Sequence, residues 1–345
     1  VVNDGSTAEN VGVLHKIYDR DGKLVSTSGI ALYLEPGESS DCMVRPTVES
    51  PHLWTDEEPY LYTLVSTVVS DGRELDSFAC KTGIRTAVFD ADQGFLLNGE
   101  AVKIKGMCVH HDCGLTGAVG YRESWERRLK ELKDMGCNGI RCSHNPPAPV
   151  LLALCDELDE AFDEWLLAKN KTDNYYSENL AYGSSMFFTN HAKEDLTAML
   201  RRDYNHPSVV IWSIGNEIPE QSSVDGVKIL KFLQDICHQE DSSRMVTSAC
   251  DNIAAVEPIR TLREFENALD VVGYNYVGRW RERAETFYEE DRKEYPERRM
   301  IGTENPSAGG IRGDYSQEGW FGNYATASLH HEALWRYTAS HDFVA

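Results

Sequence analysis

Two glutamates are the first residues in the sequence that could do chemistry together. Residues 205–217 read NHPSVVIWSIGNE and end at Glu217, and residues 300–304 read MIGTE and end at Glu304. Each segment is a short apolar run that ends in a glutamate, and such a run between turn signals is typical of a fully buried parallel strand. Hydrolysis of a glycosidic bond needs two carboxyl groups in one cleft, one as acid/base and the other as nucleophile or base.

The surrounding sequence predicts elements that could bring both glutamates to one cleft. A (β/α)₈ barrel keeps its catalytic groups just beyond the C-terminal ends of its parallel strands. From Phe89 onward, apolar strands alternate with amphipathic helices, which favours such a barrel. Residues 95–100 predict a hairpin leading into 102–106, and 125–135 predict a helix that Gly136 ends. The remaining predicted strands are 138–141, 209–214, 245–247, 271–274 and 300–301.

The predicted barrel is short of strands at two places. The predicted helix 150–158 runs directly into 159–165 with neither a turn nor an apolar strand, although the third strand is due there. The sequence also stops at Ala345, where the eighth strand would be starting. Because a barrel closes only when every strand has two neighbours, we expect it to be incomplete at its third and eighth strands.

The first part of the chain follows another pattern. Short alternating segments are separated by Asp-Gly and Pro-Gly turn dipeptides, and residues 61–69 are a strong strand candidate. Several strands at this spacing predict an antiparallel β-sandwich of immunoglobulin type. Residues 1–3 look like the tail of a strand whose beginning is absent. The predicted fold is multidomain α and β, with an immunoglobulin-like sandwich over 1–89 followed by a TIM barrel over 90–345.

Composition excludes some classes of partner. A chain of 345 residues can hold one large domain and a small one, and its hydrophobic content of 41% is ordinary for a globular protein. No stretch approaches the roughly 18 uninterrupted apolar residues of a membrane helix. The formal net charge of −22 argues against nucleic acid and anionic membranes as partners, because their phosphates would be repelled.

The nine cysteines do not follow a metal-binding pattern. Cys108 and Cys113, like Cys137 and Cys142, are spaced more widely than the pairs of a zinc knuckle. We therefore expect buried free thiols in a reducing compartment, which favours the cytoplasm. The N-terminus shows no signal peptide, but the sequence begins inside a domain, so a signal peptide upstream stays open.

Several motifs together resemble those of a known enzyme family. Residues 138–147 (NGIRCSHNPP) and 203–217 (DYNHPSVVIWSIGNE) resemble the two signature segments of glycoside hydrolase family 2. That family includes β-galactosidases, β-glucuronidases and β-mannosidases. Residues 106–112 (GMCVHHD) resemble the first barrel strand of its bacterial galactosidase-like members. Three further segments resemble the sandwich domain that precedes the barrel in this family, namely residues 53–54, 59–62 and 83–85.

The resemblance implies a retaining mechanism. Glu217 would be the general acid/base, and Glu304 would be the nucleophile that forms a covalent glycosyl-enzyme intermediate. The carboxyl groups of such a pair lie roughly 5–5.5 Å apart. Glu217 would have to be protonated near neutral pH, whereas Glu304 would have to stay ionised beside cationic or hydrogen-bonding neighbours. Arg141 on the second strand is the natural cation to keep Glu304 charged.

The resemblance also implies residues that bind the sugar. Asn216 would hydrogen-bond a 2-hydroxyl group, and His110 and His144, at the ends of the first two strands, would bind other hydroxyl groups. Tyr276 matches a tyrosine that hydrogen-bonds the nucleophile, although the register between Tyr274 and Tyr276 stays open. His111 and Asp112 are weaker candidates of the same segment.

Tryptophans could stack against a sugar ring. Trp320 lies in a loop bounded by glycines after the predicted nucleophile, and we expect it at the mouth of the site. Trp212 falls within a predicted strand, so we expect it in the core.

A metal is not expected. Some galactosidases of the family bind magnesium through a glutamate and a histidine at the end of the third strand. Glu164 matches the glutamate, but Leu166 stands where the histidine would be. Because one carboxylate does not make a magnesium site, we predict no required metal and no cofactor.

The sequence thus predicts a retaining β-glycoside hydrolase that acts on a small-molecule or oligosaccharide β-glycoside, with β-galactosidase as the main interpretation. β-Glucuronidase and β-mannosidase are the alternatives within the family. A catalytically inactive carbohydrate-binding or structural fragment is the alternative of another class, because of the incomplete barrel strands. A cellulase-like enzyme is disfavoured by the preceding sandwich. A homo-oligomer is possible; nucleic acid and membranes are excluded as partners.

Overall fold

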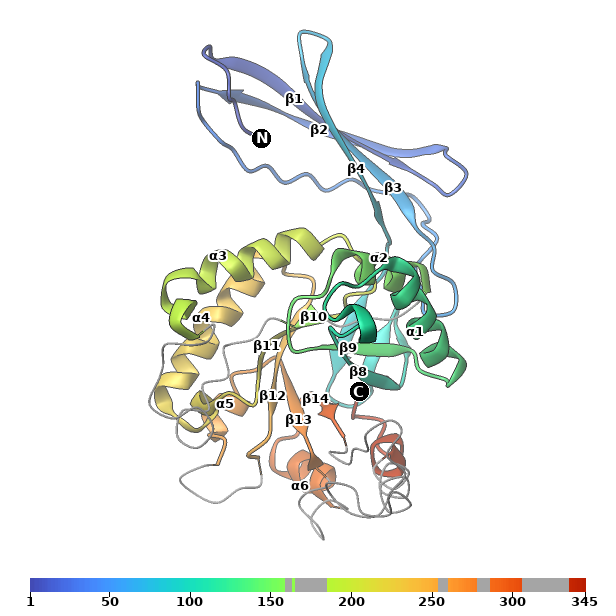
Figure 1. The fold of residues 1–345 in the computed structure, drawn as a ribbon, viewed down its shortest axis with the longest axis vertical. Coiled ribbons are helices and arrows are strands. Elements are labelled where there is room, and N and C mark those ends of the chain that lie inside the picture. The colour runs from blue at the N-terminus through green and yellow to red at the C-terminus, as the bar shows by residue number, and fades with distance from the viewer. Residues whose placement is uncertain (159–162, 165–184, 254–259, 278–285, 306–334) are drawn as a thin grey trace. The chain divides into compact units, whose positions relative to one another are not determined.

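The computed structural model describes residues 1–345 except 159–162, 165–184, 254–259, 278–285 and 306–334 (Figure 1). The described chain divides into two compact units. The first contains Val1–Arg85 with Asn205–Pro207, and the second contains Thr86–Tyr204 with Ser208–Ala345. None of the described helices combines the length and the apolar character that crossing a membrane requires.

The first unit is built on one antiparallel sheet in the order β2-β1-β3-β4. In β1, Val11, Val13 and Ile17 are buried, as the alternation of side chains along a strand requires. Asp71 and Gly72 both have positive φ angles, 48° and 75°, which a two-residue hairpin turn between twisted strands needs. The strands are β1 (Glu9–Tyr18), β2 (Leu24–Leu34), β3 (Tyr62–Ser70) and β4 (Arg73–Thr82).

The predicted sandwich needs two sheets, and the described residues of this unit form one. Residues 41–61 connect β2 to β3 without strand pairing. Within this segment Trp54 is buried and its N–H donates to the carbonyl of Ile84 at 2.8 Å, which ties the segment to the chain beyond β4. The core of the unit is therefore completed by an extended segment.

The second unit begins with a small antiparallel sheet of β5 (Ala87–Asp90), β6 (Gly94–Leu97) and β7 (Glu100–Ala101). The units divide just before β5, whereas the sequence analysis placed the domain boundary after residue 89. Gly94 has a φ of 72°, and a Cβ there would lie 2.6 Å from the carbonyl oxygen of Asp342. Only glycine fits this close approach of two backbones.

Parallel strands form the centre of the second unit (Figure 1). β8 pairs with β9, and the other five strands pair in the chain order β10 to β14. The sequence analysis predicted a strand at each of these places except β10. They are β8 (Gly106–His110), β9 (Gly139–Ser143), β10 (Asp163–Glu164), β11 (Ile211–Asn216), β12 (Met245–Cys250), β13 (Val271–Asn275) and β14 (Met300–Glu304).

The third and eighth strands of the predicted barrel are each represented by a short pairing among the described residues. β10 has two residues and pairs with β11 through Asp163 and Trp212. Near the end of the sequence, Val344 makes a parallel bridge to Met300 on the outer side of β14, where an eighth strand would lie. Whether the barrel is incomplete stays a prediction.

Helices follow most of the parallel strands and cover them with apolar faces (Figure 1). In α4, Leu230, Leu233 and Cys237 recur at helical spacing and are buried. Burial of each leucine contributes about 1.5–3 kcal/mol. The helices are α1 (Arg122–Asp134), α2 (Pro149–Leu158), α3 (Ser185–Asp203), α4 (Val224–Glu240), α5 (Arg263–Glu266) and α6 (Phe287–Glu294), with 3₁₀ turns at Gly114–Thr116 and Pro219–Ser222.

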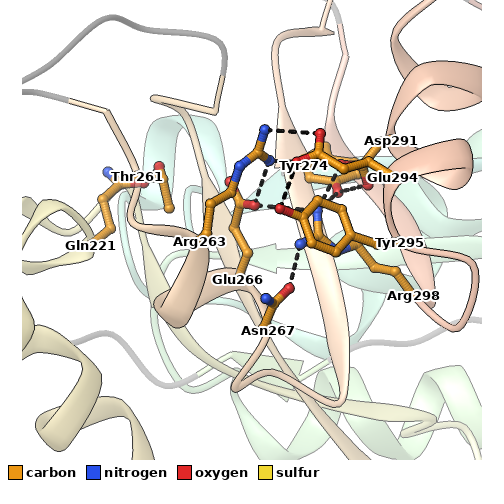
Figure 2. A network of polar contacts seen from close by, with 10 residues as sticks. All are labelled: Gln221, Thr261, Arg263, Glu266, Asn267, Tyr274, Asp291, Glu294, Tyr295 and Arg298. Atoms are coloured by element: carbon orange, nitrogen blue, oxygen red, sulfur yellow. Dashed lines mark hydrogen bonds and ion pairs between the residues drawn. The ribbon is translucent and has the colours of Figure 1, made fainter.

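A buried polar network anchors β13 to the helices that flank it (Figure 2). The hydroxyl of Tyr274 donates to Asp291 Oδ2 at 2.5 Å. Arg298 makes ion pairs with Asp291 at 2.7 Å and with Glu266 at 3.2 Å. Burial raises the pKa of Tyr274 well above its ordinary value, so its hydroxyl stays a donor. The network holds β13 in place just before the strand ends in Asn275.

All nine cysteines lie in the described residues and are free thiols. Cys142, Cys155, Cys237 and Cys250 are buried, as expected for small apolar side chains, while the others are partly or fully exposed.

Candidate active site

The predicted site residues lie on or just beyond the parallel strands of the second unit. Glu217 follows β11, Tyr276 follows β13 and Glu304 ends β14, while Arg141 lies within β9. Because parallel strands end at the same edge of a sheet, residues far apart in sequence meet there. Arg141 and Glu304 are separated by 163 positions, yet their side chains are in contact.

Glu304 is held by a cation and two further groups. Arg141 Nη1 donates to its Oε1 at 2.7 Å, and both side chains are mostly buried, 7% and 12% exposed. His144 Nε2 lies 3.3 Å from the same oxygen. The hydroxyl of Tyr276 donates to the other oxygen, Oε2. These contacts place a guanidinium beside the carboxyl group and fix its direction.

Tyr276 connects the two glutamates. Its backbone N–H donates to the carbonyl of Glu304 at 2.6 Å, and its φ of 59° is in the left-handed region. Burial raises the pKa of its hydroxyl, and the hydrogen bond and negative charge of Glu304 and the charge of Glu217 raise it further. The hydroxyl therefore stays protonated beside both carboxyl groups.

Glu217 has a different environment from Glu304. It is 8% exposed, and its Oε1 accepts a hydrogen bond from Asn275 Nδ2 at 3.0 Å. Its φ of 50° is unusual for a side chain of this size, and its N–H is held by the carbonyl of Ala249 on β12 at 2.8 Å. Left-handed residues other than glycine gather at functional sites, where the surrounding structure maintains the strain. Glu217 and Tyr276 both fit that pattern.

Asn216 is oriented by two donors. Its Oδ1 accepts from Arg141 Nη2 and from Asn275 Nδ2, both at 3.0 Å. Its Nδ2 is buried and has no hydrogen-bond partner among the described residues. A buried donor without a partner costs roughly 1–3 kcal/mol. The amide nitrogen could therefore donate to a bound group; the expected bond to a sugar 2-hydroxyl stays a prediction.

The two predicted histidines lie together. The rings of His110 and His144 meet edge to face with centroids 5.4 Å apart. The two residues that follow His110 make hydrogen bonds within their own loop instead. His111 Nε2 lies 3.0 Å from the carbonyl oxygen of Ala118, and Asp112 accepts the N–H of Gly114 at 2.8 Å.

Several predictions lie outside what the structure describes. Trp320 and Leu166 are outside the described residues, and so is the side chain of Glu164. The expected stacking residue and the expected absence of a magnesium site therefore stay predictions. Trp212 is buried in the core, where its Nε1–H donates to Asp241 at 2.9 Å.

Two residues at the centre of the site were missed by the sequence analysis. Asn275 contacts both Asn216 and Glu217, and its Oδ1 accepts from Thr303 Oγ1 at 2.6 Å. Both residues are buried polar side chains directly before Tyr276 and Glu304. Their position at the end of apolar runs could have identified them. A polar side chain buried there costs free energy unless it is hydrogen-bonded, so it needs a partner.

Comparison with known proteins assigns the chain to a family. Residues 88–340 match the family model described as "Glycosyl hydrolases family 2, TIM barrel domain", and residues 1–85 match "Glycosyl hydrolases family 2". The chain belongs to glycosyl hydrolase family 2. Its N-terminal domain and its TIM barrel domain are those of the family.

Relatives within glycosyl hydrolase family 2 have more than one named activity. The chain is 38% identical over 317 residues to a protein of Bacteroides ovatus named beta-galactosidase BoGH2A, covering 80% of this chain and 35% of that one. It is 27% identical over 304 residues to a beta-glucuronidase of Bacteroides fragilis, covering 86% of this chain and 42% of the relative. This family 2 chain thus spans well under half the length of these curated relatives.

A solved structure shares the architecture. A glycosyl hydrolase family 2 member from Bacteroides cellulosilyticus aligns with a TM-score of 0.79 at 32% identity, covering 98% of this chain and 39% of the other. The match extends through both family 2 domains.

Proposed function

We propose that this family 2 chain carries the catalytic site of a retaining β-glycoside hydrolase. The observation that carries the proposal is the contrast between two carboxyl groups that share Tyr276. Glu304 is paired with the guanidinium of Arg141, whereas Glu217 is bonded to the neutral amide of Asn275. The proposal keeps residues 1–89 as the immunoglobulin-like domain and 90–345 as the catalytic domain.

The mechanism proceeds by double displacement. The carboxylate of Glu304 attacks the anomeric carbon and forms an ester bond to it. The bond from that carbon to the aglycone oxygen breaks, and Glu217 gives its proton to this oxygen. In the second half, Glu217 takes a proton from water, the water oxygen bonds to the anomeric carbon, and Glu304 leaves as a carboxylate.

The neighbours of both residues suit these steps. Arg141 and Tyr276 aim the Glu304 oxygens and stabilise the carboxylate that leaves in the second half. Asn216 would donate its remaining N–H to the 2-hydroxyl group of the sugar, a contact that strengthens in the transition state. His110 and His144 would bind further hydroxyl groups, and Trp320 would stack against the sugar.

The proposed substrate is a terminal β-galactoside. A relative named as a beta-galactosidase shares 38% identity over 80% of the chain. The relatives named as beta-glucuronidases favour β-glucuronide as the second candidate. β-Mannoside and an inactive binding fragment are the remaining alternatives to test.

The first experiment compares the protein with its Glu304→Gln variant on nitrophenyl β-galactoside, β-glucuronide and β-mannoside. We expect turnover of one sugar, and loss of that turnover by at least about 10⁴-fold in the variant, because an amide cannot act as the nucleophile. Binding of the sugar should change little, since the amide keeps the shape of the carboxyl group. Retained turnover in Glu304→Gln would contradict the assigned nucleophile, and no turnover by the unaltered protein would favour the inactive fragment.

A further inference from the structure

A hydrogen-bonded chain of four side chains connects four strands at the site. It runs from Arg141 on β9 to Asn216 on β11, then to Asn275 on β13 and Thr303 on β14. Asn275 is completely buried, and Thr303 is 8% exposed. The proposed sugar-binding and catalytic residues lie on this chain or next to it. Asn275 and Thr303 have no part in the proposed mechanism.

The direction of every hydrogen bond in the chain is determined by Arg141. A guanidinium only donates, so the atom of Asn216 that faces Arg141 Nη2 is its acceptor, Oδ1. Oδ1 in turn needs a donor from Asn275, which places Nδ2 of that amide toward Asn216 at 3.0 Å. The oxygen of the Asn275 amide then faces Thr303, whose hydroxyl must donate to it at 2.6 Å.

This direction has a consequence for Glu217. The same Nδ2 of Asn275 donates to Glu217 Oε1 at 3.0 Å. In a protonated carboxyl group the carbonyl oxygen is the better acceptor and the other oxygen carries the proton. The bond from Asn275 therefore favours Oε1 as the carbonyl oxygen of Glu217 and Oε2 as the oxygen with the proton.

We propose that Asn275 is a positioning residue for Glu217, oriented by Arg141 through Asn216 and held by Thr303, so that Oε2 is the oxygen that carries the catalytic proton. The inference rests on the proposed function, in which Glu217 is the acid/base. Asn275 acts through Glu217 and needs no contact with the substrate.

Thr303 offers a matched pair of variants. Its methyl group packs beside Gly273, where a Cβ would lie 2.9 Å from Thr303 Cγ2. Thr303→Val keeps this methyl group and replaces the hydroxyl with a second one, so it removes the donor with little change in shape. Thr303→Ser keeps the donor and removes the methyl group. Asn275→Asp tests the amide itself, because it replaces the Nδ2 donor with an oxygen.

The test compares two aglycones. Hydrolysis of phenyl β-galactoside needs a proton on the leaving oxygen, whereas 2,4-dinitrophenolate leaves without one. We measure kcat/KM against pH for both β-galactosides, or for both β-glucuronides if the substrate panel selects that sugar. Loss of acid catalysis costs roughly 10²–10⁴-fold.

We expect Thr303→Val and Asn275→Asp to reduce kcat/KM for the phenyl glycoside by at least about 100-fold and for the dinitrophenyl glycoside by less than about threefold. Thr303→Ser should restore phenyl glycoside hydrolysis to within about tenfold of the unaltered protein. In Asn275→Asp the alkaline limb of the profile should move to higher pH, because a second carboxylate beside Glu217 favours the protonated form.

Equal losses on both aglycones in folded variants, with an unchanged pH profile, would overturn the inference and leave Asn275 a structural residue. Thr303→Val indistinguishable from the unaltered protein would overturn the role of its hydroxyl. Two other results would contradict the proposed function itself. The unaltered protein would hydrolyse neither glycoside, or the Glu304→Gln variant would retain turnover.

Discussion

At the scale of single residues, the site surrounds two glutamates with different neighbours. Glu304 contacts Arg141 and His144, whereas Glu217 contacts the amide of Asn275. A charged guanidinium therefore lies beside one carboxyl group and a neutral amide beside the other. The same contrast separates the acid from the nucleophile in glycoside hydrolysis.

A prediction at this scale concerns Glu217→Ala. The variant lacks the acid/base, so we expect slow turnover of a dinitrophenyl β-galactoside that about 1 M azide accelerates by at least about tenfold. Azide needs no base and can enter the space left by the carboxyl group. Product analysis by NMR should show a β-glycosyl azide, since two inversions restore the configuration. An α-glycosyl azide would indicate a single displacement and contradict retention.

At the scale of elements, the end of β13 and the residue after it supply three successive side chains with different contacts. Tyr274 points into the buried polar network, Asn275 contacts Glu217, and Tyr276 contacts Glu304 (Figure 2 for Tyr274). The alternation of strand side chains places 274 and 275 on opposite faces. The positive φ of Tyr276 then turns its side chain toward Glu304, which regular alternation would not do.

We predict that Tyr274→Phe destabilises the protein by about 1–3 kcal/mol, because Asp291 loses a buried donor and Arg298 loses an acceptor. Urea unfolding followed by circular dichroism measures the change. Glu294→Gln is the control at the exposed rim of the network, where Arg263 lies 3.4 Å from Glu294, and it should cost less than about 1 kcal/mol. Equal effects of both variants would show that the network does not anchor β13.

At the scale of the whole molecule, charge is the dominant feature. The chain has 56 acidic and 34 basic residues, which give the net charge of −22. Many of its ion pairs are exposed, such as Arg127 with Glu131 at 66% and 62% exposure, and such pairs stabilise little. Repulsion among the remaining carboxylates then destabilises the folded state.

We therefore predict that raising NaCl from about 20 mM to about 200 mM at pH 7 increases Tm by about 2–4 °C, because salt screens charges over about 10 Å. Differential scanning calorimetry measures the shift. The control is the same titration near the sequence pI of about 4.9, where net repulsion vanishes and the rise should disappear. A fall in Tm at pH 7 would mean that screened ion pairs outweigh the repulsion.

The sequence by itself determined the series of parallel strands and the positions of Glu217 and Glu304 at the ends of two of them. It could do so because buried strands need apolar runs, and a carboxylate after such a run is conspicuous. It also placed Arg141, Asn216 and His144 near that edge. The roles of these residues stay proposals.

Only the tertiary structure decided which residues of the site hydrogen-bond to one another. The direction of the Asn275 amide depends on Arg141 and Asn216, which come from other strands. The choice between Tyr274 and Tyr276 as the partner of Glu304 depends on a positive φ that no local pattern encodes. Hydrogen bonds between residues distant in sequence follow from strand register and packing, and these exist only once the strands lie side by side.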